Sequence, residues 1–134
     1  MPQSFQSTWW QIAVPLPWQA EECEACVEFT QPEGVGALHI SGIRKTDGDV
    51  LDAEVLSELR NDCPGGIETQ IAHCGDFVGY CAEHVDGATS FYWKKWLVAC
   101  RKILLFATYN CKHGEEGLEA PQVSALLASL QCKE

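Results

Sequence analysis

Two long apolar segments joined by only two residues constrain the fold of this chain more than any other feature. The segments Thr89–Cys100 and Ile103–Cys111 are separated by Arg101-Lys102, which leaves room for a tight turn between antiparallel strands. A two-residue turn predicts three cross-strand pairs: Cys100 with Ile103, Trp96 with Ala107, and Lys94 with Tyr109. Successive strand residues point to opposite faces, and both faces are apolar near the turn. The pattern therefore predicts a sheet that is covered on both faces.

Four further segments have the composition and the flanking turn residues that are typical of strands. They are bounded by Pro, Gly and Asp residues, which favour turns. The predicted strands are Trp9–Val14, Glu24–Thr30, Gly36–Ile43 and Phe77–Val85. With the two long segments, they indicate a mostly antiparallel sheet.

Two amphipathic helices are also indicated. The first is predicted over Asp49–Arg60, with Asp49 as N-cap and apolar residues at helical spacing from Leu51 to Leu59. The second is expected to begin near Pro121, which suits the first turn of a helix, and to continue to Leu130. Helices and antiparallel strands in this order predict a layered α+β fold.

The length and the net charge of the chain limit its domain organisation and its possible partners. A chain of 134 residues fits one domain over residues 1–134. Its formal net charge is −10, whereas nucleic-acid-binding and membrane-surface proteins usually present basic faces, so we expect no nucleic acid and no membrane as partner. The first twenty residues lack Lys and Arg, so we expect no signal peptide. The sequence contains no apolar stretch of about 18 residues, so we expect no membrane-spanning helix. We therefore expect a cytoplasmic protein that needs no cofactor.

The acidic residues are unevenly distributed along the chain. Residues 1–67 contain 11 acidic and 3 basic residues, whereas residues 68–134 contain 8 and 6. This asymmetry predicts an acidic face in the first half of the chain, which can either aid solubility or receive a basic partner.

Eight cysteines raise the question of a disulfide framework or a metal site. Because several lie in apolar segments, we expect mostly free core thiols. The spacing of Cys23-Glu-Ala-Cys26 suits a redox pair or half of a zinc site. Its acidic neighbours would raise the thiol pKa values, and residues three apart in a strand face opposite sides. A metal- or redox-responsive site at Cys23 and Cys26 therefore remains the alternative, and no metal ligand is assigned.

The segment Phe91–Trp96 concentrates aromatic rings and positive charge. Trp93, Lys94 and Lys95 are candidate binding residues for an acidic or aromatic ligand. The alternative is an ordinary strand whose Trp residues pack into the two layers and whose Lys residues are solvated. No nucleophile, phosphate-loop or metalloprotease motif is present, so no catalytic residue is assigned and we expect no enzyme.

The order of several short sequence phrases resembles the PsbP-like superfamily, in particular its small bacterial members. The phrases are Leu16–Trp18, Gly34–Ser41, Gly75–Tyr80, Trp96–Val98, Leu105–Tyr109 and Leu126–Leu130. The resemblance covers nearly the whole chain and implies an α/β/α sandwich around an antiparallel sheet. It also implies a binding or accessory role, since some bacterial relatives act as chaperones or adaptors for secreted effectors.

We expect a non-enzymatic binding protein, because the chain has a strongly negative net charge, contains no catalytic motif and resembles this superfamily. We expect an adaptor, chaperone or immunity-type domain with a protein partner.

Overall fold

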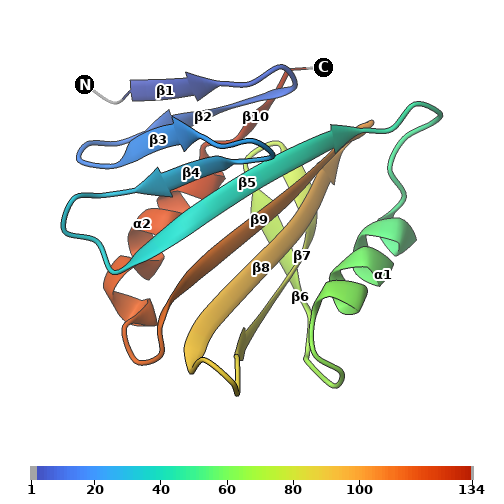
Figure 1. Ribbon diagram of the computed structural model, residues 1–134. Helices are drawn as coiled ribbons and strands as arrows, with labels where there is room; N and C mark the ends of the chain where they lie inside the picture. The colour runs from blue at the N-terminus through green and yellow to red at the C-terminus, as the bar shows by residue number, and fades with distance from the viewer. Residues whose placement is uncertain (1–2, 134) are drawn as a thin grey trace.

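The computed structural model describes residues 3–133, which form ten strands and two helices (Figure 1). In chain order these are β1 (Gln3–Gln6), β2 (Trp10–Val14), β3 (Gln19–Glu22), β4 (Val27–Thr30), β5 (Gly36–Arg44), α1 (Asp52–Asp62), β6 (Gln70–Cys74), β7 (Phe77–Val85), β8 (Phe91–Cys100), β9 (Ile103–Lys112), α2 (Glu116–Ala128) and β10 (Gln131–Cys132). Seven strands pair in the order β3-β4-β5-β9-β8-β7-β6, and β1, β2 and β10 make a separate three-stranded sheet. The paired strands are antiparallel throughout, and the predicted α+β class is confirmed.

The hairpin of β8 and β9 forms the centre of the large sheet. Its register matches the two-residue turn: Cys100 lies opposite Ile103, Trp96 opposite Ala107, and Lys94 opposite Tyr109. Arg101 adopts a φ of 54°, the left-handed conformation that a tight hairpin turn requires. The face that carries Trp96 and Ala107 packs against α2, and the opposite face packs against α1. We call them the α2 face and the α1 face.

The α2 face is covered along its length. Helix α2 contributes Leu126 and the three-stranded sheet contributes Trp10 and Ile12, all of them buried against residues such as Leu38 and Leu105 of the large sheet. In Figure 1 the three-stranded sheet lies above α2 and completes this layer. The burial of so many apolar side chains makes this layer the main core of the protein.

The α1 face is covered only in part. Helix α1 contacts β7 and β8, where Val55 and Leu59 pack against Ala82 and Leu97. The strands β5 and β9 lie beside the helix instead of beneath it (Figure 1). Ile43 of β5, which belongs to this uncovered part, has 62% of its surface exposed.

The start of α1 differs from the prediction. The helix begins at Asp52 with Leu51 as N-cap, so Asp49 does not cap it. The carboxylate of Glu54 accepts the Leu51 backbone N–H at 2.9 Å, which satisfies one of the free donors at the helix start. The predicted cap failed because the first turn is closed by a glutamate inside the helix and not by a side chain before it.

Helix α2 begins five residues before the predicted start, so Pro121 lies inside the helix and not in its first turn. The additional turn is anchored by Glu119, which is only 2% exposed. Its carboxylate accepts the Gly36 N–H at 3.0 Å, the Tyr109 hydroxyl at 2.7 Å and the Gln31 side-chain amide. One buried carboxylate therefore joins α2 to the turn between β4 and β5 and to β9.

The segment predicted as one strand, Glu24–Thr30, consists of turn residues followed by β4, and a further strand, β3, precedes the turn. β3 and β4 pair with Glu22 opposite Val27, and residues 23–26 connect them, with the Cys23 N–H donating to the Cys26 carbonyl at 2.7 Å. β3 was missed because all four of its residues are polar or small and exposed, so it has no apolar alternation. The other predicted strands correspond to β2, β5, β7, β8 and β9, whereas β1, β6 and β10 were not predicted.

We predict that Glu119→Ala lowers the free energy of unfolding by about 3 kcal/mol, because three donors lose a buried acceptor. Glu119→Gln should cost less, since its amide keeps one acceptor oxygen. Urea unfolding followed by circular dichroism measures both variants, and Ser124→Ala, at an exposed position of the same helix, is the matched control. Equal stabilities of Glu119→Ala and Ser124→Ala would contradict this account.

Candidate functional site

A groove follows the side of α1 where the helix leaves β5 and β9 uncovered. It consists of two adjoining hollows of about 300 and 600 Å³. The two share Ile43, Glu58 and Leu104 and therefore form one continuous depression. We call it the α1 groove.

The floor of the α1 groove is apolar. Leu104 and Phe106 of β9 point to the α1 face, directly opposite Ile43 and Ser41 of β5. Leu104 and Phe106 are half-buried, and Ile43 is largely exposed. An exposed cluster of large apolar side chains in a concave surface is typical of binding sites.

The wall formed by α1 is acidic. The helix presents a stripe of polar residues to the groove, at the spacing that keeps side chains on one side of a helix. These residues are Glu54, Ser57, Glu58, Asn61 and Asp62. An apolar floor beside an acidic wall is complementary to apolar and cationic groups.

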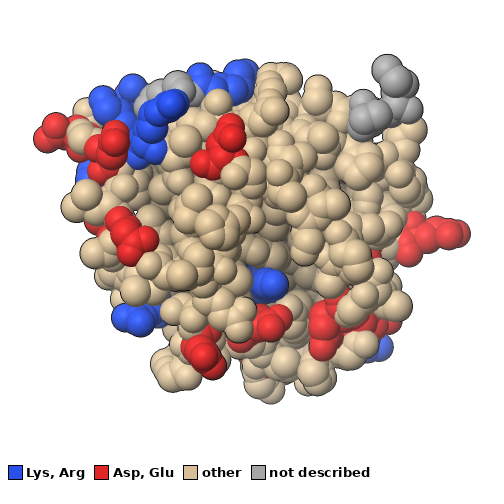
Figure 2. All heavy atoms as spheres, turned by 180° about the vertical axis from the view of Figure 1, so that it is seen from behind, with Lys and Arg blue, Asp and Glu red and all other residues tan. Residues whose placement is uncertain are grey.

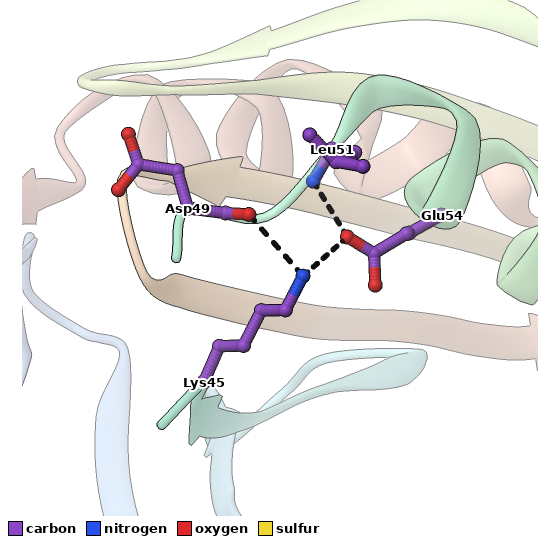
Figure 3. Close-up of polar contacts among 4 residues, drawn as sticks. All are labelled: Lys45, Asp49, Leu51 and Glu54. Atoms are coloured by element: carbon purple, nitrogen blue, oxygen red, sulfur yellow. Dashed lines mark hydrogen bonds and ion pairs between the residues drawn. The ribbon is translucent and has the colours of Figure 1, made fainter. Parts of the chain in front are cut away.

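Lys45 lines the end of the groove next to the start of α1, where it contacts Asp49 and Glu54 (Figure 3). Lys45 Nζ lies 2.7 Å from Glu54 Oε1 and 3.3 Å from the Asp49 carbonyl oxygen. The hydrogen bond from Lys45, followed by that from the Leu51 N–H, lowers the pKa of Glu54 below its usual value. Glu54, which accepts the Leu51 N–H at the start of the helix, is thus also part of the groove wall.

The other end of the groove carries a second ion pair. Lys95 Nζ lies 3.1 Å from Asp62 Oδ2 and donates to the Asp62 carbonyl at 2.8 Å. A cation at the C-terminal end of a helix interacts favourably with the helix dipole. Lys95, a predicted binding residue, therefore ties β8 to the last turn of α1.

The three predicted binding residues are divided between the two faces of the sheet. Trp93 and Lys95 point to the α1 face, and Lys95 lies over the Trp93 ring at 5.6 Å. Lys94 points to the α2 face, where its Nζ lies 5.1 Å from the centre of the Trp96 ring. The sequence cluster is therefore not one surface, because alternate residues of a strand face opposite sides.

Lys94 lines a second cavity, of about 190 Å³, between α2 and the sheet. The acids around it already have partners: Glu83 accepts the Tyr92 hydroxyl, and Glu116 accepts the Gly114 N–H at 2.7 Å. Burial, followed by the bond to Glu83, raises the pKa of Tyr92 far above its usual value. This cavity is smaller and both of its carboxylates have partners, so it is the weaker candidate.

Cys23 and Cys26 lie at the turn between β3 and β4. The prediction that they face opposite sides of a strand is wrong, because neither belongs to a strand and the turn brings their side chains into contact. Desolvation raises the pKa of the Cys23 thiol, and Cys26, Glu28 and Glu21 raise it further. Within residues 3–133, no group of three or more His, Cys, Asp or Glu side chains is placed to hold a metal ion.

Most acids of the first half of the chain lie in two separate groups and not on one face, and the other three, Glu33, Asp47 and Asp49, lie in the loops before and after β5. The first is the β3–β4 hairpin at one edge of the sheet, and the second is α1, which packs on β7 and β8. Lys and Arg side chains gather at one corner of the molecule, over the end of β5 and the β8–β9 turn, where the Lys45 N–H donates to the Lys102 carbonyl (Figure 2). The α1 group is the one that borders an apolar depression.

The groove was missed by sequence reasoning because its residues come from β5, β8, β9 and α1. One signal was available: the predicted helix Asp49–Arg60 carries acids at positions 54 and 58, a four-residue spacing that places them on one side, and Asp62 continues this spacing just beyond its predicted end. None of the helices in the described part of the chain is long and apolar enough to cross a membrane.

Comparisons with known proteins support the fold. No protein-family model matches the chain, and no curated protein matches it. A crystal structure from Bacteroides thetaiotaomicron VPI-5482, at 1.50 Å resolution, aligns over 98% of this chain with 16% identity and a TM-score of 0.71. The solution structure of the cyanobacterial PsbP (CyanoP) from Synechocystis sp. PCC 6803 aligns over 98% with 12% identity and a TM-score of 0.62.

These alignments confirm the PsbP-like fold that the sequence phrases predicted. The chain spans 48% of the Bacteroides structure and 92% of CyanoP. At such low identity, the likeness concerns the fold, and the function has to be argued from the α1 groove.

The ion pair at the Lys45 end of the groove generates a pH prediction. Because the pKa of Glu54 is lowered in the folded protein, its carboxylate stabilises the fold above the unfolded-state pKa, and this contribution is lost as the pH falls through the folded-state pKa. Glu54→Gln should therefore be less stable than wild type at neutral pH, and this difference should disappear at acidic pH, where the carboxylate is protonated. Urea unfolding of both proteins across this range measures the difference, and a gap that is constant with pH would contradict the prediction.

Proposed function

We propose that this chain is a non-enzymatic protein-binding domain, of the adaptor, chaperone or immunity type, and that the α1 groove is its binding site. The observation that carries the proposal is the apolar floor of Leu104, Phe106 and Ile43 beside the acidic wall of α1. Such a floor, when covered by a partner, supplies the free energy of association, and charged groups at its rim supply specificity.

The position of the groove also supports this role. The main core lies on the other side of the sheet, so the groove residues are not needed to fill it. Away from α1 the same face becomes polar, with Thr108 opposite His39 and the Glu28–His39 pair at 3.0 Å. Along β5 and β9 the apolar surface is therefore limited to the end next to the helix, as expected for a defined docking site.

The groove lining favours binding over catalysis. Two of its carboxylates are held by lysines, and its remaining surface is mainly aliphatic and aromatic. These groups can hold a partner that carries apolar and positive side chains.

A matched pair of variants tests the proposal. Ile43→Ser removes an exposed apolar side chain from the groove, whereas Ile71→Ser removes one from the same face on the far side of α1, where Ile71 is 69% exposed. Both should fold, because neither side chain is buried. We expect Ile43→Ser to weaken partner binding about tenfold or more and Ile71→Ser to leave it unchanged.

The measurement is affinity capture from a lysate of the source organism with each protein immobilised, quantified by mass spectrometry and repeated with the purified partner. A partner retained equally by both variants would place the binding site elsewhere. The absence of any partner that depends on Ile43 would contradict the proposal.

The contact between Cys23 and Cys26 favours one second candidate, a two-thiol site that responds to a metal or to oxidation. The hairpin turn brings the two thiols close together, whereas in a regular strand they would point to opposite faces. Both residues line a cavity of about 340 Å³, which is also lined by Trp9. The raised pKa of Cys23 argues against a reactive thiolate at neutral pH.

Elemental analysis and thiol alkylation test whether Cys23 and Cys26 form a two-thiol site. For protein purified without a tag, we expect no stoichiometric zinc or iron and slow alkylation of Cys23, because its pKa is raised. Stoichiometric metal that is lost in Cys23→Ser, or alkylation of Cys23 far faster than that of Cys63, would support the two-thiol site.

A further inference from the structure

We infer that the α1 groove takes a short segment of a partner protein in which one Lys or Arg side chain is flanked by apolar side chains, with Glu58 as the carboxylate that receives the cation. This inference rests on the proposed function and specifies the chemistry of the partner.

Glu58 differs from the other two acids of the α1 wall. Glu54 is paired with Lys45 and Asp62 is paired with Lys95, so both ends of the groove are neutralised by the protein itself. Glu58 lies between them and contributes to both hollows, yet it forms no ion pair with any of residues 3–133. The middle of the groove therefore presents one negative charge without an internal counter-ion.

The apolar surface lies next to this charge. Ile43 and Leu104 line both hollows together with Glu58, and Phe106 extends the floor toward Asp62. A cation that binds Glu58 would thus have apolar neighbours on the partner within reach of the floor. Exclusion of water by the flanking apolar groups would strengthen the ion pair.

The length of the α1 groove limits the length of the partner segment that it can hold. Its helical wall runs from Glu54 to Asp62, which corresponds to roughly 12 Å along the axis of α1. About four extended residues have this length. One basic residue with an apolar residue on either side fills it.

The partner is held through side chains at the floor and the wall of the groove. β9 pairs with β5 and β8 along the floor, whereas β4 pairs with β5 only as far as Ile40, so Ser41–Arg44 have a strand partner on the β9 side alone. Specificity therefore depends on the charge of Glu58 and the apolar floor. The net charge of −10 also attracts basic segments in general, and the test has to separate this effect from recognition by Glu58.

The test uses three blocked peptides of equal length: Leu alternating with Lys, with Ser or with Glu. Each is titrated into the ¹⁵N-labelled wild-type protein, into Glu58→Lys and into Glu33→Lys, and binding is measured from amide shifts and isothermal titration. Glu33 is an exposed acid in the turn before β5, roughly 20 Å along that strand from Ile43, so Glu33→Lys makes the same change of net charge away from the groove.

We expect the Leu–Lys peptide to shift the amides of Ile43, Glu58 and Leu104 and to bind wild type about tenfold more tightly than the Leu–Ser peptide does at low salt. Glu58→Lys should abolish this preference and favour the Leu–Glu peptide. In 0.15 M salt, where the Debye length is about 8 Å, Glu33→Lys should change the affinities less than about twofold. Glu58→Gln, which introduces no new charge, should remove the preference for Lys over Ser and covers the case in which Glu58→Lys does not fold.

The outcomes separate the two proposals. If the Leu–Lys and Leu–Ser peptides bind the groove equally and Ile43→Ser weakens both, the groove is a binding site but the inferred partner chemistry is wrong. If Glu58→Lys and Glu33→Lys weaken binding equally, the preference reflects net charge and the inference is overturned. If no peptide shifts the groove amides, the proposed function fails as well.

Discussion

The arrangement of the whole protein depends on a sheet that is apolar on both faces. The β8–β9 hairpin places Trp96 and Ala107 on one face and Leu97 and Phe106 on the other, so water has to be excluded from both. The α2 face is covered by α2 and the three-stranded sheet together, which include Leu126 and Ile12. The α1 face is covered by one helix of eleven residues, which shields β7 and β8 and leaves part of β5 and β9 open. The α1 groove is the consequence of this unequal coverage.

Charge gives the groove its chemical character. The acids of α1 serve two purposes: Glu54 and Asp62 fix the ends of the helix through Lys45 and Lys95, and Glu58 faces the groove between them. The buried Glu119 has a different role on the other side of the sheet, where it binds Gly36 and Tyr109 and positions α2. Acidic residues that look alike in the sequence thus differ in the structure: Glu54, Asp62 and Glu119 are held by neighbouring groups, whereas Glu58 forms no ion pair within residues 3–133.

The sequence predicted the elements that apolar periodicity defines. The boundaries of β7 and the register of β8 with β9 follow from alternation and from the two-residue turn. Elements without such a pattern were missed: β3 is exposed along its length, and the first turn of α2 is anchored by the charge of Glu119. The Cys23–Cys26 contact and the α1 groove arise from residues brought together by turns and by packing between distant segments. Periodicity contains no information on such contacts, so neither could be derived before the fold was known.

The central claim is that the α1 groove receives a basic, apolar segment. Paramagnetic relaxation from a spin label attached to a bound Leu–Lys peptide measures the location of the peptide directly. The account predicts strong broadening of the amides of Ile43, Glu58 and Leu104 and none at Glu33. Broadening that is concentrated on the acidic β3–β4 hairpin, with the groove amides unaffected, would contradict it.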